Sequence, residues 1–289
     1  MRQGLAFSRR FTPPQGQTLP HSFREKAGPC GVHLPSCGVY IFHIKKMNVE
    51  NDNLIQEILS RIQFRFMDEF TPGSTNCKRD PQANLHGLDL ANTQIIDDDN
   101  PLMTMDYLRN PRMSTITMAY IINRLVKNMS SDLVYLNIGI WCGWSFFAGI
   151  IGNNKKCIGV DNYSQNEKQN DKKIFEYQYE ILKNNLSKFY EMDYLDYFKN
   201  IHKEKIGVYF YEGDHSYNNQ LMALEIADPF LMKGAYILVD DTNDNEPYKA
   251  TIDFVSKNKD KFEIVLDKKT PNNSHPTFWN GLLIIKKII

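Results

Sequence analysis

Several features that would narrow the class of this protein are missing from its sequence. It has no run of the roughly 18 to 20 apolar residues that span a membrane. Lys plus Arg and Asp plus Glu each count 34, so the zero net charge provides no global attraction to nucleic acid or to an anionic membrane. We therefore expect no nucleic-acid or membrane partner, and cytoplasmic localisation is the default expectation.

Cysteine is also scarce and shows no metal or disulfide pattern. The five cysteines are an odd number, and no two of them form a Cys-x-x-Cys pair. Neither a disulfide framework nor a zinc knuckle is therefore indicated. With 42% hydrophobic and 24% charged residues, the chain has an ordinary globular composition and is long enough for one large core with an accessory region.

Residues 1–46 differ from the rest of the chain in charge and composition. They contain seven Lys and Arg, a single acid, Glu25, and many Pro and Gly. An Arg-rich, acid-poor leader is typical of an organellar transit peptide, but the same composition suits an upstream extension with Met47 as the true first residue. We favour the second interpretation and expect residues 1–46 to be a disordered leader or a non-native extension.

Residues 47–130 are expected to form a helical and loop region that serves as a lid and contacts the substrate. Apolar residues at helical spacing predict one helix over 51–70 and another from Ser114, its expected cap, to about Asn128. Between them, residues 71–112 are polar and rich in turn residues. The candidate substrate contacts are Phe64, Phe66, Phe70, Tyr107, Asp97–Asp99, Trp279 and Asn280. For most of the aromatic residues among them, a position in the core is the more frequent outcome.

From residue 131 onward, short apolar runs alternate with longer amphipathic ones. This alternation predicts a Rossmann-like α/β domain over 131–289, because parallel strands need crossover helices and these cover both faces of the sheet. The last two strands are separated by a turn-rich stretch without a helix, so they are expected to pair antiparallel. The seven candidate strands are residues 133–138, 157–161, 188–192, 206–211, 235–239, 262–266 and 281–285, and helices are expected from about residue 144 and over 171–185, 220–232 and 248–257.

The ends of the first two strands suggest a nucleoside site, because ligands of open parallel sheets bind beyond the carboxyl ends of the strands. Gly139 and Gly143 stand in the turn after the first strand, where missing Cβ atoms allow a ligand to approach, and Ser145 can cap the next helix. Asp161 ends the second strand, a position from which a carboxylate can bind ribose hydroxyls. The turn lacks the Gly-x-Gly-x-x-Gly pattern of dinucleotide sites, and an ordinary glycine turn is the alternative.

Later strands also end in polar residues. Asp193 follows the third strand, where it can bind an adenine amino group or cap a helix. Asp214 and His215 follow the fourth strand, and Asp240 and Asp241 follow the fifth. If these ends adjoin, a divalent cation such as Mg²⁺ would relieve the repulsion between the three acids, unless each acid simply caps a helix. His215 is either a general base or a structural residue of its turn.

These strand-end motifs resemble those of class I S-adenosylmethionine (SAM)-dependent methyltransferases of the small-molecule O-methyltransferase group. The group includes sugar and macrolide O-methyltransferases and cephalosporin-hydroxylase-like proteins. The resemblance covers about residues 133–289 and rests on residues 137–145, 158–161, 212–217 and 239–241. It implies a seven-stranded sheet with a reversed last strand, and SAM as the cofactor.

The resemblance also implies roles for the cofactor-binding residues. The turn from Gly139 to Gly143 would hold the methionine end of SAM, and Asp161 would bind its ribose. Asn137, Ser145 and Asp193 are expected to contact the cofactor as well. Asn137 stands where the group usually has an acid, so one contact to the amino-acid end of the cofactor would lose its charge.

For the reaction itself, the resemblance implies that Asp214, Asp240 and Asp241 bind Mg²⁺ and that Asp214 or His215 removes the substrate proton. Glu212 replaces a common Asp of the group but keeps the carboxylate. We therefore predict metal-assisted O-methylation of a small hydroxylated molecule, sugar-like or polyketide-like. The alternatives are a non-catalytic cofactor-binding module, motivated by Asn137, and a nicotinamide-dependent oxidoreductase. A homo-oligomer is compatible with the sequence.

Overall fold

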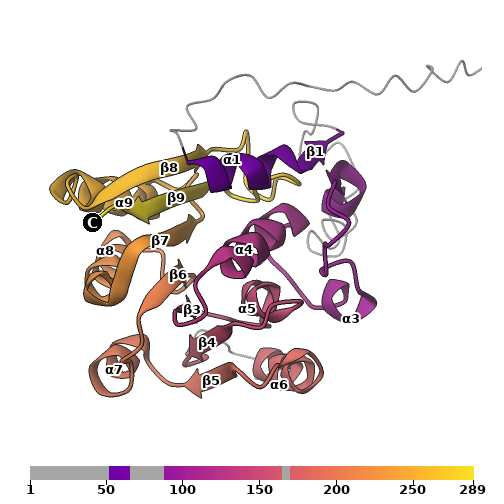
Figure 1. The fold of residues 1–289 in the computed structure, drawn as a ribbon, viewed down its shortest axis with the longest axis horizontal. Coiled ribbons are helices and arrows are strands. Elements are labelled where there is room, and N and C mark those ends of the chain that lie inside the picture. The colour runs from indigo at the N-terminus through magenta and orange to yellow at the C-terminus, as the bar shows by residue number, and fades with distance from the viewer. Residues whose placement is uncertain (1–51, 66–87, 165–169) are drawn as a thin grey trace, which may run out of the picture. The chain divides into compact units, whose positions relative to one another are not determined.

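A seven-stranded sheet organises the described part of the chain, which comprises residues 52–65, 88–164 and 170–289 of the computed structural model (Figure 1). The strand order is β5-β4-β3-β6-β7-β9-β8, and only β9 runs antiparallel to its neighbours. The strands are β3 (Val134–Ile138), β4 (Lys156–Asp161), β5 (Ser187–Glu191), β6 (Ile206–Tyr211), β7 (Leu231–Asp240), β8 (Phe262–Lys268) and β9 (Leu282–Lys287). The predicted α/β sheet with a reversed last strand is confirmed.

Helices cover both faces of this sheet, as the alternation in the sequence predicts. Successive side chains of a strand point to opposite faces, so Tyr135 of β3 packs with α1, α4, α5 and Phe175 of α6, while Val134 and Leu136 pack with α7, α8 and α9. Figure 1 shows these two helical layers on either side of the strands. The helices are α4 (Ile116–Asn128), α5 (Trp144–Ile150), α6 (Asn170–Leu182), α7 (Tyr194–Asn200), α8 (Tyr217–Ala227) and α9 (Asn245–Lys257).

The chain reverses its direction across the sheet between β3 and β6. It runs outward from β3 through β4 to β5 and then returns to form β6 on the other side of β3. The loops after β3 and β6 therefore leave the sheet side by side and diverge, which opens a crevice at the carboxyl ends of these two strands. This position in the sheet is where a ligand is expected.

The predicted helix over residues 51–70 is wrong in its extent. Helix α1 (Asn53–Ser60) ends before strand β1 (Ile62–Phe64), which pairs with β2 (Thr93–Ile95). The reason is that the apolar spacing changes from helical to alternating at Ile62 and Phe64. The expected contacts Phe66 and Phe70, like the predicted leader, lie outside the described residues.

Other element boundaries also differ from the prediction. The described part of the turn-rich segment contains a short helix at 88–92 and α3 (Met105–Leu108). Helix α4 is capped by Thr115, whose hydroxyl accepts from the Met118 N–H, and not by Ser114. Helix α7 was not predicted, since its seven residues are too few to show a helical period and no glycine turn marks its start as Gly143 marks that of α5.

The segment before α4 is fastened to the core by a buried ion pair. Arg112 donates to Asp89 over 2.7 Å, and the two side chains are 1% and 2% exposed. The second carboxylate oxygen of Asp89 accepts from the Ile116 N–H at the start of α4. Arg112 also lies over the ring of Trp144, 4.4 Å from its centroid. This pair therefore holds the segment 88–115 against α5.

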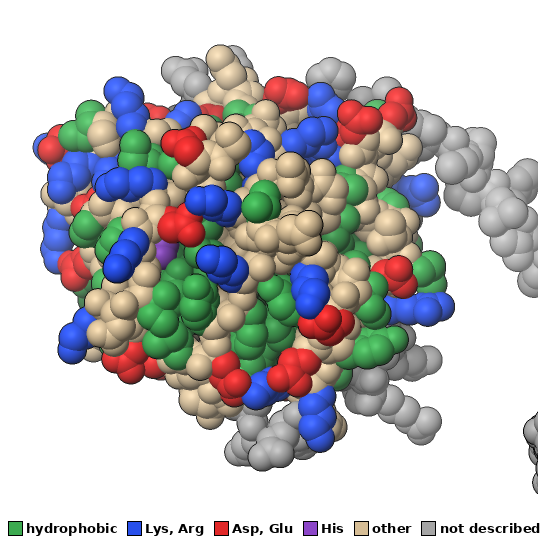
Figure 2. All heavy atoms as spheres, turned by 60° about the horizontal axis from the view of Figure 1, so that its bottom comes forward, with side chains coloured by type: hydrophobic (Ala, Val, Ile, Leu, Met, Phe, Trp, Pro, Cys, Tyr) green, Lys and Arg blue, Asp and Glu red, His purple; other side chains and the backbone are tan. Residues whose placement is uncertain are grey.

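The surface carries both signs of charge. Figure 2 shows Lys and Arg side chains next to Asp and Glu over one face of the molecule, as the zero net charge implies. Among the described residues, no helix combines the length and the apolar character needed to cross a bilayer.

We expect Asp89→Ala to lower the free energy of unfolding by about 3–5 kcal/mol, because it leaves the Arg112 charge buried without its carboxylate. Glu180→Ala breaks the exposed Lys183–Glu180 pair and should cost at most about 1 kcal/mol. Urea unfolding of both variants measures the difference. Equal losses in the two variants would contradict the structural role of the buried pair.

Candidate active site

A cavity of about 1060 Å³ lies at the carboxyl ends of β3, β4, β6 and β7. Small-molecule sites typically occupy roughly 300–1,000 Å³, so this volume is at the top of that range. Every non-glycine residue with positive φ in the described chain lines it: Trp141, Tyr163, Asp241, Ser274 and Trp279. Backbone strain of this kind gathers at functional sites, where the surrounding structure maintains it. The cavity is therefore the candidate active site.

Gly139 allows the two loops at the crevice to meet. Its φ is +76°, and a Cβ atom at this position would lie 2.3 Å from the carbonyl oxygen of Glu212. Gly143 has a different role: its φ is +93°, and a Cβ would lie 2.4 Å from the ring of Phe147. Gly139 lines the cavity and Gly143 does not. Only the first predicted glycine is thus brought to the site.

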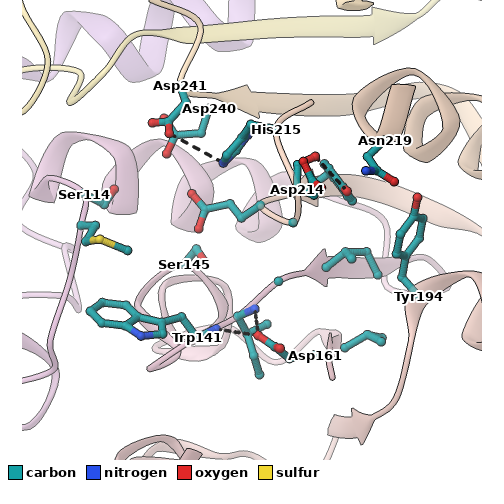
Figure 3. A pocket seen from close by; sticks show the side chains of 18 of the residues that line it. Ser114, Trp141, Ser145, Asp161, Tyr194, Asp214, His215, Asn219, Asp240 and Asp241 are labelled. Atoms are coloured by element: carbon teal, nitrogen blue, oxygen red, sulfur yellow. Dashed lines mark hydrogen bonds and ion pairs between the residues drawn. The ribbon is translucent and has the colours of Figure 1, made fainter. Parts of the chain in front are cut away.

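Asp161 organises the turn after β3. The N–H groups of Ile140 and Trp141 donate to its Oδ2 over 2.8 and 2.9 Å, and the N–H of Tyr163 donates to its Oδ1 over 2.7 Å. A carboxylate offers about four acceptor positions. One position on Oδ1 therefore remains for a ligand, and Asp161 lines the cavity as predicted (Figure 3).

Asn137 and Ser145 lie together, but only Ser145 reaches the cavity. Asn137 is fully buried, and its Oδ1 accepts from the Ser145 hydroxyl over 2.8 Å and from the Tyr135 hydroxyl over 3.3 Å. It does not line the cavity. The structure therefore gives Asn137 a packing role that joins β3 to α5, in place of the predicted direct contact with the cofactor.

Asp193 has one of the two roles that the sequence left open, the cap of α7, and also reaches the cavity. Its Oδ1 accepts from the Leu195 N–H over 2.8 Å and so caps α7. The residue also lines the cavity beside Asn162 and Tyr194. Capping leaves Oδ2 directed to ligand or solvent, with only a 3.5 Å contact from the Asn162 amide.

The predicted trio of metal-binding aspartates does not assemble. Figure 3 shows Asp240 and Asp241 together, with Asp214 apart from them beyond His215. The carboxyl that contacts Asp240 is that of Glu212. Within residues 52–65, 88–164 and 170–289, no group of three or more His, Cys, Asp and Glu is arranged to hold a metal ion. These side chains therefore do not fit the predicted Mg²⁺ site.

Burial changes the proton affinities of the carboxyls in this group. It raises the pKa of Glu212 to about 7, and it raises the pKa of Asp240 together with the charges of Asp241 and Glu212. The pKa of Asp241 is raised by burial as well. By contrast, hydrogen bonding from the Ser216 N–H lowers the pKa of the exposed Asp214. Asp214 is therefore held in its charged form and is a weak base.

His215 lies beside Asp241 at the edge of the cavity. Its Nε2 lies 3.7 Å from Asp241 Oδ2, so the carboxylate can orient the ring. Its Nδ1 is buried without a hydrogen-bond partner among the described residues. His215 is one of the residues that line the cavity.

Several residues of the cavity lining were not assigned from the sequence, and Glu212, Asn273 and Ser274 are among them. Glu212 stands at the same strand end as Asp214, and the strand-end rule alone could have assigned it. Asn273 and Ser274, next to the predicted Trp279 and Asn280, line the cavity because the loop before β9 folds over it. The loop before β9 is far in sequence from the other residues of the cavity, and no local sequence pattern predicts that it lies there.

The other described candidates for substrate contact lie outside the lining of the cavity. Tyr107 is fully buried and stacks on Trp144 with ring centroids 4.1 Å apart. Phe64 packs edge-on against Phe278. Asp97 pairs with arginines away from the cavity, and neither Asp98 nor Asp99 lines it.

Residues 136–242 match the family model described as a methyltransferase domain. This match confirms the resemblance to class I methyltransferases. No curated protein matches the chain.

Solved structures include distant likenesses. One is the O-methyltransferase TomG from Streptomyces achromogenes in complex with SAM, with 10% identity over 60% of this chain and 78% of that chain and a TM-score of 0.44. Another is an rRNA methylase from Streptococcus thermophilus, with 14% identity over 60% of this chain and 96% of that chain and a TM-score of 0.45. A protein of Corynebacterium glutamicum has 14% identity over 60% and 81% of the two chains and a TM-score of 0.45. Likenesses this distant carry no argument about activity.

We expect Gly139→Ala to destabilise the chain and to weaken the binding of S-adenosylhomocysteine, because its Cβ forces the loops after β3 and β6 apart. Gly234→Ala is the matched control, since Gly234 has a φ of +82° but no atom within 4 Å of the added Cβ. The control should lose only the backbone cost of about 1–2 kcal/mol. Urea unfolding should show a further loss of about 1–3 kcal/mol in Gly139→Ala. Equal losses would mean that the close approach is not required.

The raised pKa of Glu212 predicts a pH-dependent stability. Because the folded-state pKa of about 7 exceeds the ordinary value of 4.5, the folded chain binds more protons between these values, and the contribution of Glu212 to stability falls as pH rises. Glu212→Gln should therefore gain stability relative to the unmodified chain between about pH 5 and about pH 8. Urea unfolding across this range measures the trend, with the exposed Glu225→Gln as control. A difference that does not vary with pH would contradict the assignment.

Proposed function

We propose that this chain is a SAM-dependent methyltransferase that methylates a hydroxyl group of a small molecule. The observation that carries the proposal is one continuous cavity at the reversal point of the sheet. It joins the Gly139 turn and Asp161 to a second group of residues, Glu212, His215 and Asp241. All of these residues fall within the segment that matches a methyltransferase domain. One cavity therefore contains both the residues that we assign to the cofactor and those that we assign to the methyl acceptor.

The residues at the ends of β3, β4 and β5 fit the cofactor. The free acceptor position on Asp161 suits a ribose hydroxyl, and Asp193 and Asn162 lie where they can bind an adenine amino group. Ser145 and the Gly139 turn face the same space and suit the methionine end. When bound, SAM supplies a methyl group that is already electrophilic because it is attached to a sulfonium. The chain then has to align the acceptor oxygen and remove its proton.

His215 is our candidate for the group that removes this proton. An imidazole is suited to proton transfer near neutral pH, and the Nε2 of His215 lies 3.7 Å from Asp241 Oδ2. Asp214 was an equal candidate from the sequence. Its hydrogen bond from Ser216 and its lowered pKa make it the weaker base.

Magnesium assistance remains a prediction, and the carboxyls do not form a metal site among the described residues. The non-catalytic alternative was based on the neutral side chain of Asn137. Asn137 lies in the core and does not line the cavity, so it no longer supports that alternative. A nicotinamide cofactor has no support in the glycine turn.

Methyl transfer from isotopically labelled SAM to a panel of hydroxylated small molecules tests the proposal. We expect turnover by the unmodified chain and a loss of about 10²–10⁴-fold in kcat for His215→Gln, which removes the base. Asp214→Asn, the matched control on the same turn, should retain most of the activity. Both variants should bind S-adenosylhomocysteine as the unmodified chain does, because neither side chain is assigned to the cofactor.

Failure of the unmodified chain to bind S-adenosylhomocysteine by calorimetry would refute the methyltransferase function. Full activity of His215→Gln would refute only the assignment of the base. The same assay with a chelator decides whether a divalent cation takes part.

A further inference from the structure

The acceptor half of the cavity has a distinctive charge. We define this half as the loop after β6 (212–216), the residues that end β7 (240–241) and the loop before β9 (273–280). Of the described residues that line the whole cavity, none is Lys or Arg, and six are acids: Asp161, Asp193, Glu212, Asp214, Asp240 and Asp241. The many cations seen on the surface in Figure 2 are thus absent from this lining.

Two side chains beside the cavity, Asp240 and Trp144, each bury a polar atom that has no hydrogen-bond partner in the described part of the chain. Asp240 is 3% exposed, and its Oδ1 accepts no hydrogen bond from any described residue. Trp144 is 4% exposed, and its Nε1–H likewise donates to none of them. Both residues line the cavity. Buried polar groups are normally paired. The Asp240 carboxyl contacts that of Glu212, which leaves the Trp144 Nε1–H as the buried donor at this edge of the cavity without a hydrogen-bond acceptor among the described residues.

The remaining side chains of this half hold the carboxyls in position without neutralising them. The Asn280 amide donates to Asp241 Oδ1 over 2.8 Å, and its own oxygen accepts from the Ser274 N–H over 2.6 Å. The amide is neutral, and His215 is the single basic side chain among the described residues of the lining. A negative charge placed here would meet the carboxylate of Asp214, whose lowered pKa keeps it charged, and the neighbouring carboxyl of Asp241, but no Lys or Arg of the described lining.

We propose that the acceptor has hydrogen-bond donors, either hydroxyl or ammonium groups, and carries no negative charge. This inference rests on the proposed function, because it describes the molecule that would receive the methyl group. It excludes phosphorylated or carboxylated small molecules. It also excludes RNA, whose binding relies on Lys and Arg contacts to phosphates. Between otherwise equal molecules, a cationic donor binds more tightly than a neutral one, because it forms charge-assisted hydrogen bonds with the carboxyls.

Three glycosides that differ in charge test this inference. The chain is first titrated with S-adenosylhomocysteine, and the loaded chain is then titrated with phenyl β-D-glucoside, with its 2-amino-2-deoxy counterpart and with phenyl β-D-glucuronide. The neutral probe isolates hydroxyl donors and the amino probe adds the ammonium. We expect the amino probe to bind most tightly and the glucuronide at least about tenfold more weakly than the neutral probe, a factor that corresponds to about 1.4 kcal/mol.

Asp241→Asn shows whether the carboxyls cause this order. Asn tolerates positive φ and can keep the contact with Asn280, so the backbone should be retained. We expect the preference for the amino probe over the glucuronide to shrink by about tenfold, as one charge is lost. Asp260→Asn, an exposed change outside the cavity, should leave the order unchanged.

Tighter binding of the glucuronide or of an RNA hairpin than of the neutral probe would overturn the inference. So would the absence of binding by all three glycosides, or an unchanged order in Asp241→Asn. If S-adenosylhomocysteine itself does not bind, the proposed function fails. If it binds and the order is reversed, only the inference about the acceptor fails.

Discussion

The close packing of the loop after β3 against the loop after β6 is the constraint on which the site depends. The strand order reverses here, so two loops that leave neighbouring strands have to pass each other before they diverge. Gly139 permits the contact, since any Cβ would strike the Glu212 carbonyl. The Asp161 carboxylate then holds the first loop by accepting from three backbone N–H groups. One carboxylate therefore shapes the turn and still faces the cavity.

The same contact brings acids of two strands into a confined space. Glu212 follows β6 directly, and Asp240 ends the adjacent β7, so their carboxyls meet. Burial and mutual repulsion favour their protonated forms and raise the pKa of both groups. Asp214, only two residues beyond Glu212, turns outward because the Ser216 N–H binds it. The carboxyl directly after β6 is thus buried, whereas the carboxyl two residues later is exposed.

Much of the fold could be predicted because the strands of the sheet are short apolar runs separated by helices. The errors have physical causes. The helix over 51–70 was extended too far because the apolar spacing changes at Ile62. Helix α7 was missed because it is short and no glycine turn marks its start. Asn137 was assigned to the cofactor because of its place in the sequence motif. The direction of its side chain depends on a hydrogen bond with Ser145 of α5, which the sequence does not reveal.

The sequence by itself determined the alternation of strands and helices, the glycine turn and the presence of acids after β4, β6 and β7. These features are local, since each depends on residue spacing or on one backbone position. Only the tertiary structure decided which acids meet, that Asn280 and Trp279 close over them, and that no described Lys or Arg enters the lining. Such properties depend on loops that are far apart in the chain, and their side chains acquire direction only when the sheet brings those loops together.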